Sequence, residues 1–286
     1  MRVPEELAGH WFWSHTRHLW HDVEVVASRA QKAERLTWLL LTVIAVVRLS
    51  ALHTQSNAMW GERVWLLEWL PQNNLALAIG FHASVIIISL ANLLRSSRNL
   101  RIAGFVVWLL YAAYCSSFGK LNHDLYLVLL VTFGWTLLSR SGRPLWDALV
   151  LRGIQLAMLC IYSVLGLWKI LWAVIELVQG DISMFNPLAA RNTLIWHYSV
   201  LEWTPAAQWA HDHYTMLWIG MWIAIFIEVG AVIAFFTERN QRMWGCLLIA
   251  LHAGIAVTMN INMYPAVAMI AVVLVVPNLP SLHRCG

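Results

Sequence analysis

MLCIYSVLGLWKILWAV, residues 158–174, is one of the most apolar stretches of this chain, and it fits the interior of a transmembrane helix. Lys169 lies inside it and is one of only three lysines in the sequence. An ammonium group in hydrocarbon costs about 3 kcal/mol even on lenient insertion scales. The stretch therefore predicts a membrane protein in which Lys169 has a functional role.

The composition is that of an integral membrane protein. Of the 286 residues, 60% are hydrophobic and only 12% are charged, against about 25% charged in an average soluble domain. Several of the 18 tryptophans lie near the ends of apolar runs, where indole rings anchor to the lipid headgroup region. The net charge of +4 is interpreted as membrane topology, because no basic stripe indicates a nucleic-acid partner.

Residues 1–35 are predicted to form an N-terminal interfacial segment that lies on the bilayer surface. The segment mixes tryptophan with His10, His15, His18 and His21, and it lacks the apolar core and cleavage site of a signal peptide. The histidine spacing does not keep the last three on one helical face, so no metal site is predicted. The four cysteines show no paired spacing, which argues against a disulfide framework.

Eight apolar runs approach the roughly 20 residues that a transmembrane helix requires. They lie at about 36–53, 75–94, 102–117, 121–138, 153–177, 216–236, 243–260 and 264–278. The sequence thus predicts an all-α bundle of about eight transmembrane helices. Its transmembrane domain would cover 36–278, and a short cytoplasmic tail would follow at 279–286.

Arginine and lysine residues gather in every second connection between these runs, beginning with the segment before the first run. Because cytoplasmic loops carry the excess of basic residues, both termini are predicted to be cytoplasmic, in the inner (cytoplasmic) membrane of the cell. The longest connection on the opposite side covers about 180–214 and contains many aromatic and histidine residues, among them His197. It is predicted to be a loop that serves as a lid or faces a substrate.

Several polar side chains fall in the outer half of the bilayer in this topology. Besides Lys169 they are His82, Asn122, His123, Tyr126, His252 and Tyr264, which come from different predicted helices. Together they could line one cavity that opens away from the cytoplasm.

Each of these side chains also has a purely structural interpretation. His82 could bond to a neighbouring helix, and Asn122 could cap the helix that follows it. An ion pair between Arg48 and Glu228 would account for two further intramembrane charges. Lys169 has no carboxylate three or four residues away, so its structural alternative is an ammonium that extends to the outer interface.

An amine in an apolar pocket has a chemistry of its own. Desolvation favours the neutral amine, which can act as a general base near neutral pH or form a Schiff base with a carbonyl compound. Histidine and asparagine side chains beside it could bind an oxygen-bearing substrate or stabilise an oxyanion. A lipid-soluble quinol would reach such a site directly from the bilayer.

Four short motifs occur in order along the chain. They are Asn122-His123-Asp-Leu-Tyr126-Leu, then Tyr162 with Lys169-Ile170, then Glu228-Val-Gly230, and finally Leu251-His252 followed by Asn262-Met263-Tyr264-Pro265. Across residues 36–278, their order and spacing resemble the transmembrane domain of the vitamin K-dependent gamma-carboxylase. They resemble the stand-alone bacterial HTTM proteins more closely.

This resemblance implies roles for several residues. Lys169 would be the base that works with a menaquinol or vitamin K-type hydroquinone, with oxygen consumed as the quinol is epoxidised. Asn122, His123 and His252 match positions of the same active region, and Glu228 matches an acidic residue of the family. The family's active site faces the non-cytoplasmic side, in agreement with the predicted topology.

The function expected from these residues is that of a membrane-embedded, carboxylase-like enzyme, a quinol-dependent lyase or oxidoreductase. Lys169, His123 and His252 are predicted to be catalytic. The residues expected to contact a substrate or cofactor are Asn122, Tyr126, Tyr264, His82 and His197. Because the chain ends soon after its last apolar run, it is expected to lack the carboxylase's propeptide-recognising portion, and a small peptide at the outer face is an alternative substrate. The competing interpretation is a non-enzymatic protein that binds a secreted peptide or protein during maturation or export.

Overall fold

The computed structural model describes residues 23–50, 75–116, 124–139, 143–199, 201–261 and 263–279. Within these ranges the chain forms helices and no strand, which confirms the predicted all-α class. Most of the predicted interfacial segment lies outside the described residues. Its last part belongs to α2 (Val23–Ser50), which continues without a break through residue 35 into the first predicted transmembrane run.

Helices occupy the described parts of all eight predicted apolar runs. After α2 they are α4 (Leu75–Leu94), α5 (Arg98–Ser116), α6 (Asp124–Thr136), α7 (Pro144–Gln179), α10 (Tyr214–Gly230) with the 3-10 helix η4 (Ala231–Phe236), α11 (Glu238–Met259), and α12 (Tyr264–Ile270) with η5 (Ala271–Val275) and η6 (Val276–Asn278).

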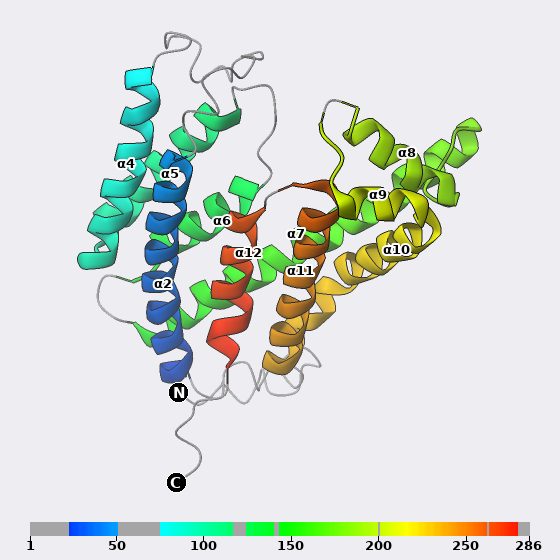
Figure 1. Cartoon of the computed structure of the whole chain (residues 1–286). Coiled ribbons are helices and arrows are strands. Elements are labelled where there is room, and N and C mark those ends of the chain that lie inside the picture. Colours follow the sequence, from blue (N-terminus) through cyan, green and yellow to red (C-terminus); the bar gives the residue numbers. More distant parts are fainter. Residues whose placement is uncertain are drawn as a thin grey trace, which may run out of the picture. The chain divides into compact units, whose positions relative to one another are not determined.

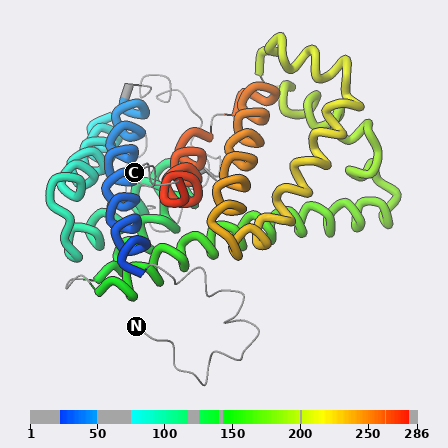
Figure 2. The backbone as a smooth tube through the Cα atoms, turned by 90° about the horizontal axis from the view of Figure 1, so that it is seen from below, coloured from blue at the N-terminus to red at the C-terminus, as the bar shows by residue number. Residues whose placement is uncertain are grey.

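Five of these helical segments are long and apolar enough to cross a bilayer, namely α4, α5, α7, α10 with η4, and α11. They make this a membrane-embedded protein whose apolar helices contact lipid. The helix α7 is the longest, with 36 residues and therefore about 54 Å, and Figure 2 shows it as one continuous helix. The full number of eight spans and the sidedness stay predictions.

The chain divides into two compact units, each described here by itself. Unit 1 contains Gln155–Met263, and unit 2 contains the described residues up to Ile154 together with Tyr264–Pro277. The helix α7 therefore contributes its first part to unit 2 and its longer second part to unit 1. The prediction that residues 36–278 form one domain stays a prediction.

Unit 2 is a helical bundle with an aromatic core. Its helix α4 packs between α2 and α5, α5 packs against α6, and α12 packs against α6 and α2; Figures 1 and 2 both show α2, α4 and α5 side by side. Trp38, Trp108, Tyr111 and Trp135 are completely buried in this bundle. Their indole N–H and hydroxyl groups need partners there, and the Trp108 indole N–H donates to Ser89 Oγ at 3.0 Å.

One end of unit 2 is held together by buried polar contacts. Glu34 of α2 accepts a hydrogen bond from Ser96, which lies between α4 and α5, and forms an ion pair with Arg101 of α5, with 3.5 Å between Nε and Oε1. Arg101 also donates to the carbonyl of Trp135 near the end of α6, at 3.1 Å. The basic segments at the start of α2 and between α4 and α5, which the sequence assigned to one side, therefore lie at one end of this unit.

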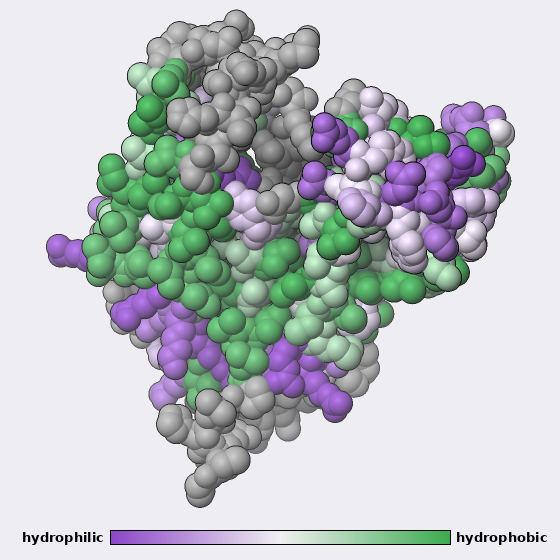
Figure 3. Space-filling view, in the orientation of Figure 1, coloured by the Kyte–Doolittle hydropathy of each residue, from purple (hydrophilic) through white to green (hydrophobic). Residues whose placement is uncertain are grey.

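The surface of unit 2 is polar at this same end and apolar along the middle of α2. The helix α2 exposes Leu39, Val43 and Val46, which share one helical face. Figure 3 shows hydrophobic surface over this helix and hydrophilic side chains near its N-terminal end. Apolar side chains that face outward over the middle of a helix are the arrangement expected for contact with lipid.

The connection 180–214 in unit 1 is not the loop that the sequence predicted, because it contains α8 (Pro187–His197) and α9 (Pro205–Asp212). Each helix begins with a proline in its first turn after a capping side chain, Asn186 for α8 and Thr204 for α9. Both features are typical of helix starts. A small apolar core of Leu194, Tyr198, Ala207 and Ala210 joins the two helices.

Candidate functional site

The polar cluster of unit 1 begins on one face of α7. Tyr162, Gly166 and Lys169 are spaced by four and three residues, so they share a helical face, and Ser163 lies beside them. A Cβ atom added to Gly166 would lie 2.8 Å from the backbone nitrogen of Val229 in α10. The two helices therefore approach closely at Gly166, and this approach brings Lys169 within reach of α10.

At this contact α10 stops being a regular α-helix. The Ala231 N–H donates to the carbonyl of Glu228, three residues back, and the chain continues as the 3-10 helix η4. The carbonyl of Ile227 would accept that N–H in an α-helix, and here it accepts the Trp244 indole N–H instead, at 2.7 Å. Non-helical hydrogen bonding at membrane depth persists where other groups satisfy the released backbone.

Ser163 of α7 supplies the other partners at this transition. Its hydroxyl lies 3.2 Å from the carbonyl oxygen of Glu228 and 2.9 Å from that of Val229, to which it donates. It also accepts the N–H of Val232 at 2.9 Å. One hydroxyl therefore links α7 to both sides of the change from α10 to η4, and it holds the backbone of Glu228 in place.

Lys169 and Glu228 form an ion pair between α7 and α10. The ammonium Nζ lies 2.7 Å from Oε1 and 2.6 Å from Oε2 of the carboxylate. The Glu228 side chain is only 6% exposed, whereas that of Lys169 is 44% exposed. The carboxylate is thus enclosed by protein, and the amine is accessible from one side.

The alternative pairing of Glu228 with Arg48 is wrong. Glu228 pairs with Lys169, and the Arg48 Nε–H donates to the hydroxyl of Tyr264 at 3.2 Å, with the guanidinium 5.7 Å from the centre of the tyrosine ring. Local spacing could not predict the Lys169 pair, because its partner lies 59 residues further along the chain.

Beside this ion pair, α7 and α11 are joined by a hydrogen bond between Tyr162 and His252. The hydroxyl lies 2.7 Å from Nε2, and both side chains are buried. The other ring nitrogen, Nδ1, is also buried, and it has no hydrogen-bond partner among the described residues. Leaving a buried polar atom unpaired costs about 1–3 kcal/mol, so a hydrogen-bonding group placed beside this nitrogen would be favourable.

His82 has a different environment, in unit 2. Its Nδ1 lies 2.8 Å from the carbonyl of Ala78, and its Nε2 lies 3.0 Å from the hydroxyl of Tyr111. The carbonyl requires a donor, so Nδ1 carries the proton and the tyrosine hydroxyl donates to Nε2. Both ring nitrogens are satisfied within the protein, as the structural interpretation of this residue predicted.

His197 is bound to the end of α11. Its Nε2 lies 2.5 Å from the carbonyl of Met259, and the neighbouring Tyr198 hydroxyl donates to the carbonyl of Thr258 at 3.1 Å. These side chains satisfy the last carbonyls of the helix, which have no intrahelical donor, next to Asn260 with its left-handed φ of 51°. The structure thus gives His197 a capping contact.

The other predicted site residues divide between the two units. Asn122 and His123 lie outside the described residues. Tyr126 of α6 is 46% exposed, and it belongs to unit 2 together with Tyr264 and His82. Of the predicted residues, Lys169 and His252 come together in one cluster. A single cavity lined by all of them stays a prediction.

Sequence reasoning missed two members of the cluster, Ser163 and Trp244, and quoted Tyr162 only within a motif. Tyr162 and Ser163 precede Lys169 by seven and six residues, so the helical period was a signal that could have found them. Trp244 binds a carbonyl released by the change in α10, and no sequence pattern showed that change. Within the described part of the chain, no group of three or more potential metal-binding side chains occurs.

Comparisons with family models, with curated proteins and with solved structures find no match to this chain. The resemblance to HTTM proteins therefore stays a prediction based on four short motifs. The chemistry of the site follows from its own contacts. These are an accessible amine paired with an enclosed carboxylate, and next to them a tyrosine–histidine pair with one free ring nitrogen.

Proposed function

We propose that this protein is a membrane-embedded, carboxylase-like enzyme in which Lys169 removes a proton from a lipid-soluble hydroxyl compound of the quinol type. The observation that carries the proposal is the buried Nδ1 atom of His252, which lacks a partner among the described residues. A polar ligand atom beside it would remove the cost of leaving this nitrogen unpaired.

The residues present suit a quinol-type ligand. A quinol offers a hydroxyl that can donate or accept a hydrogen bond and an apolar body that enters from lipid, and apolar pockets with a few placed polar groups are typical of small-molecule sites. Exposed apolar side chains of α7 next to the lysine, Leu165, Trp168 and Trp172, offer contacts for such a body. The quinol would supply the reactive oxygen.

The ion pair provides the base. In the resting state Lys169 carries a proton, and transfer of this proton to Glu228 gives a neutral amine and a neutral acid with no net change of charge. The amine then takes the proton of the ligand hydroxyl, and the resulting ammonium lies beside the new oxyanion and stabilises it. The exposed ammonium of Lys169 later releases a proton to water, and Glu228 returns its proton to the amine, which restores the ion pair.

Two histidine positions would support this step. His252 would hold the ligand oxygen through Nδ1, while Tyr162 fixes the orientation of the ring through Nε2. His123, the third predicted catalytic residue, lies outside the described residues, and its assignment rests on the motif alone. A small peptide presented at the outer face remains the alternative substrate.

A non-enzymatic function is the second candidate, and the ion pair itself favours it. The charge of Lys169 already has a carboxylate partner, so the residue could serve only to join α7 to α10 while the protein binds a secreted peptide or protein. The two functions differ in what they require of residue 169. A base must lose its proton, whereas a structural cation need only keep its charge.

Replacing Lys169 by arginine and by methionine distinguishes the two. Arginine keeps the positive charge and can pair with Glu228, but it does not lose its proton in proteins. We expect both Lys169→Arg and Lys169→Met to lower the turnover of added menaquinol by about 10²–10⁴-fold, the usual contribution of a general base. The quinol anion passes two electrons to dissolved oxygen and loses its second proton, which gives quinone and hydrogen peroxide. Turnover is measured from the absorbance of this quinone, with the full chain in nanodiscs.

The controls separate folding from chemistry. Arg191→Gln changes another cation of unit 1 and is expected to leave turnover unchanged. If Lys169→Arg turns over quinol at the wild-type rate, the base assignment is wrong. If wild-type protein neither oxidises menaquinol nor binds it, as judged by quenching of tryptophan fluorescence, the non-enzymatic function is favoured.

A further inference from the structure

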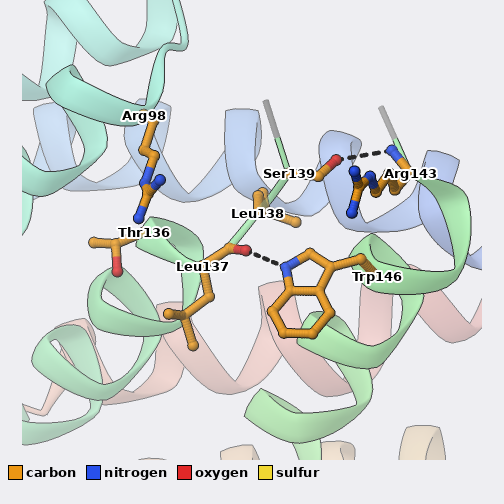
Figure 4. A pocket seen from close by; sticks show the side chains of 7 residues that line it. All are labelled: Arg98, Thr136, Leu137, Leu138, Ser139, Arg143 and Trp146. Carbon is orange, nitrogen blue, oxygen red and sulfur yellow. Dashed lines mark hydrogen bonds between the residues drawn. The ribbon is translucent and has the colours of Figure 1, made fainter. Parts of the chain in front are cut away.

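A second polar site lies in unit 2, at the end where the basic connections gather. It is a pocket of about 360 Å³ between the start of α5, the end of α6 with the three residues that follow it, and the start of α7. Figure 4 shows Arg98 on one side of this pocket and Arg143 on the other, with Leu137 and Leu138 between them and the ring of Trp146 below. The candidate active site of unit 1 shares no residue with it.

Hydrogen bonds between side chains and the backbone give the pocket a defined shape. The Trp146 indole N–H donates to the carbonyl of Leu137 at 2.5 Å, and the Arg143 N–H donates to Ser139 Oγ at 2.8 Å. The Ser139 N–H in turn donates to a carboxylate oxygen of Asp147, also at 2.8 Å. The Asp147 side chain is buried. Its carboxylate therefore binds the protein backbone and not the solvent of the pocket.

Two arginines, Arg98 and Arg143, line the described part of the pocket. Both arginines are exposed, and neither guanidinium has a hydrogen bond or an ion pair with the described residues. The described lining contains no carboxylate, since its other members are hydroxyl, leucine and tryptophan side chains. Guanidinium groups bind phosphate oxygens through paired hydrogen bonds. The Ser139 hydroxyl accepts the Arg143 N–H and keeps its own hydrogen for a phosphate oxygen, whereas the Thr136 hydroxyl already donates to the carbonyl of Phe133.

The surroundings of the pocket are apolar. Leu137 is 46% exposed and Trp146 is 49% exposed, and both line it. On the first two turns of α7, Leu145 and Leu149 are exposed as well. A ligand here would therefore meet cations at one end and lipid-facing side chains at the other, and a tryptophan beside a cluster of arginines is typical of the headgroup region.

We propose that this pocket binds the phosphate headgroup of an anionic phospholipid, such as phosphatidylglycerol, from the leaflet that the basic connections face. A lipid headgroup and a soluble phosphate compound both offer a phosphate group that the arginines could bind. The exposed leucines and the tryptophan favour the lipid, because a soluble phosphate would leave them without a partner. Basic pockets next to transmembrane helices are suited to anionic headgroups.

Native mass spectrometry of the full chain tests the proposal. The protein is released from nanodiscs of equal parts phosphatidylglycerol and phosphatidylcholine, and the retained lipids are counted. We expect the wild type to retain phosphatidylglycerol preferentially. Each substitution, Arg98→Gln or Arg143→Gln, should lower this preference about fivefold and the double variant about 30-fold, from the usual contribution of one basic residue at an anionic surface.

Two matched variants make the experiment specific. Arg95→Gln removes an exposed arginine of the same connection that does not line the pocket, and it should leave the preference unchanged. Replacing Arg98 and Arg143 by lysine together should retain part of it. Equal losses in Arg95→Gln and in the pocket variants would overturn the proposal, because they would mean a diffuse surface charge.

The source of the phosphate is tested separately. Millimolar inorganic phosphate is added to the same nanodiscs before release. If the bound phosphatidylglycerol persists, the lipid headgroup is supported. If inorganic phosphate displaces it and is itself retained by the wild type but not by the double variant, the pocket binds a soluble phosphate compound and the lipid proposal is wrong.

Discussion

The two units each contain a buried histidine–tyrosine pair, and the two pairs differ in whether the second ring nitrogen of the histidine has a hydrogen-bond partner. In unit 2 the His82 Nε2 lies 3.0 Å from Tyr111, and in unit 1 the His252 Nε2 lies 2.7 Å from Tyr162. His82 uses its second nitrogen to bond the carbonyl of Ala78 within its own helix. The corresponding atom of His252 has no partner among the described residues. The same residue pair is complete in one unit and open in the other.

The ion pairs of the two units differ in the same sense. Arg101 and Glu34 in unit 2 are 7% and 6% exposed, so both charges are enclosed. Lys169 and Glu228 in unit 1 are 44% and 6% exposed, so one charge remains accessible. Arg101 Nε makes no hydrogen bond with the described residues, so the unit 2 pair is distinguished by the enclosure of both charges and not by complete hydrogen bonding. The unit 1 pair leaves one charge accessible beside the unpaired ring nitrogen of His252, and this is why the candidate site is assigned to unit 1.

The largest effect on stability is expected in the closed ion pair. Replacing Glu34 by glutamine leaves the Arg101 cation buried without a counter-charge, which typically costs about 3–5 kcal/mol. The matched change Glu228→Gln leaves Lys169 unpaired but accessible, and its long side chain can extend to the interface. Thermal unfolding in detergent micelles should therefore show less than half as large a loss for Glu228→Gln.

A double variant checks the cause of that difference. Glu34→Gln together with Arg101→Gln removes both charges and should be more stable than Glu34→Gln alone, because no unpaired buried charge is left. If the double variant is the least stable of the three, the loss does not arise from the unpaired cation. Equal losses in Glu34→Gln and Glu228→Gln would remove the contrast between the two units.

The second prediction concerns the close approach that assembles the open cluster. Gly166→Ala would place a methyl group 2.8–2.9 Å from backbone and side-chain atoms of Glu228 and Val229. Such overpacking costs about 1–3 kcal/mol, and it should separate Lys169 from its carboxylate. The matched control on the same helix is Gly153→Ala, where nothing lies within 4 Å of the added methyl.

The control is expected to be neutral or slightly stabilising, because alanine favours a helix more than glycine does. Thermal unfolding reports the loss of stability, and menaquinol turnover reports the effect on the cluster. A Gly166→Ala variant as stable and as active as Gly153→Ala would show that α7 and α10 do not depend on this contact.

Apolar length and periodicity were sufficient to predict the all-α class and the positions of the long helices. The run around Lys169 was predicted at about 153–177, and the structure extends its helix to Pro144–Gln179. The helices α8 and α9 were missed although Asn186-Pro187 and Thr204-Pro205 carry the signature of helix starts. Their polar, aromatic composition was interpreted as a loop because they are too short to be recognised by hydropathy.

The candidate site was predictable only in part, because its decisive contacts join distant residues. Lys169 could be singled out from the sequence because it is a cation in an apolar run. Its carboxylate partner depends on how α7 packs against α10, and local spacing does not predict that packing. The exchange of hydrogen bonds around Ser163 likewise requires the change from α10 to η4. Sequence indicates which residues are costly in a membrane, and packing decides which of them meet.

The smallest predicted effect is the difference between the two histidines themselves. Both His82→Phe and His252→Phe leave a buried tyrosine hydroxyl without its histidine partner, which costs about 1–3 kcal/mol, and His82→Phe removes a second hydrogen bond as well. His252→Phe removes one hydrogen bond but also removes the unpaired Nδ1, so its loss should be about 1 kcal/mol smaller. Thermal unfolding of both variants measures this difference, and menaquinol binding should be lost only in His252→Phe. If both variants bind menaquinol as the wild type does, the Nδ1 atom of His252 is not a ligand contact.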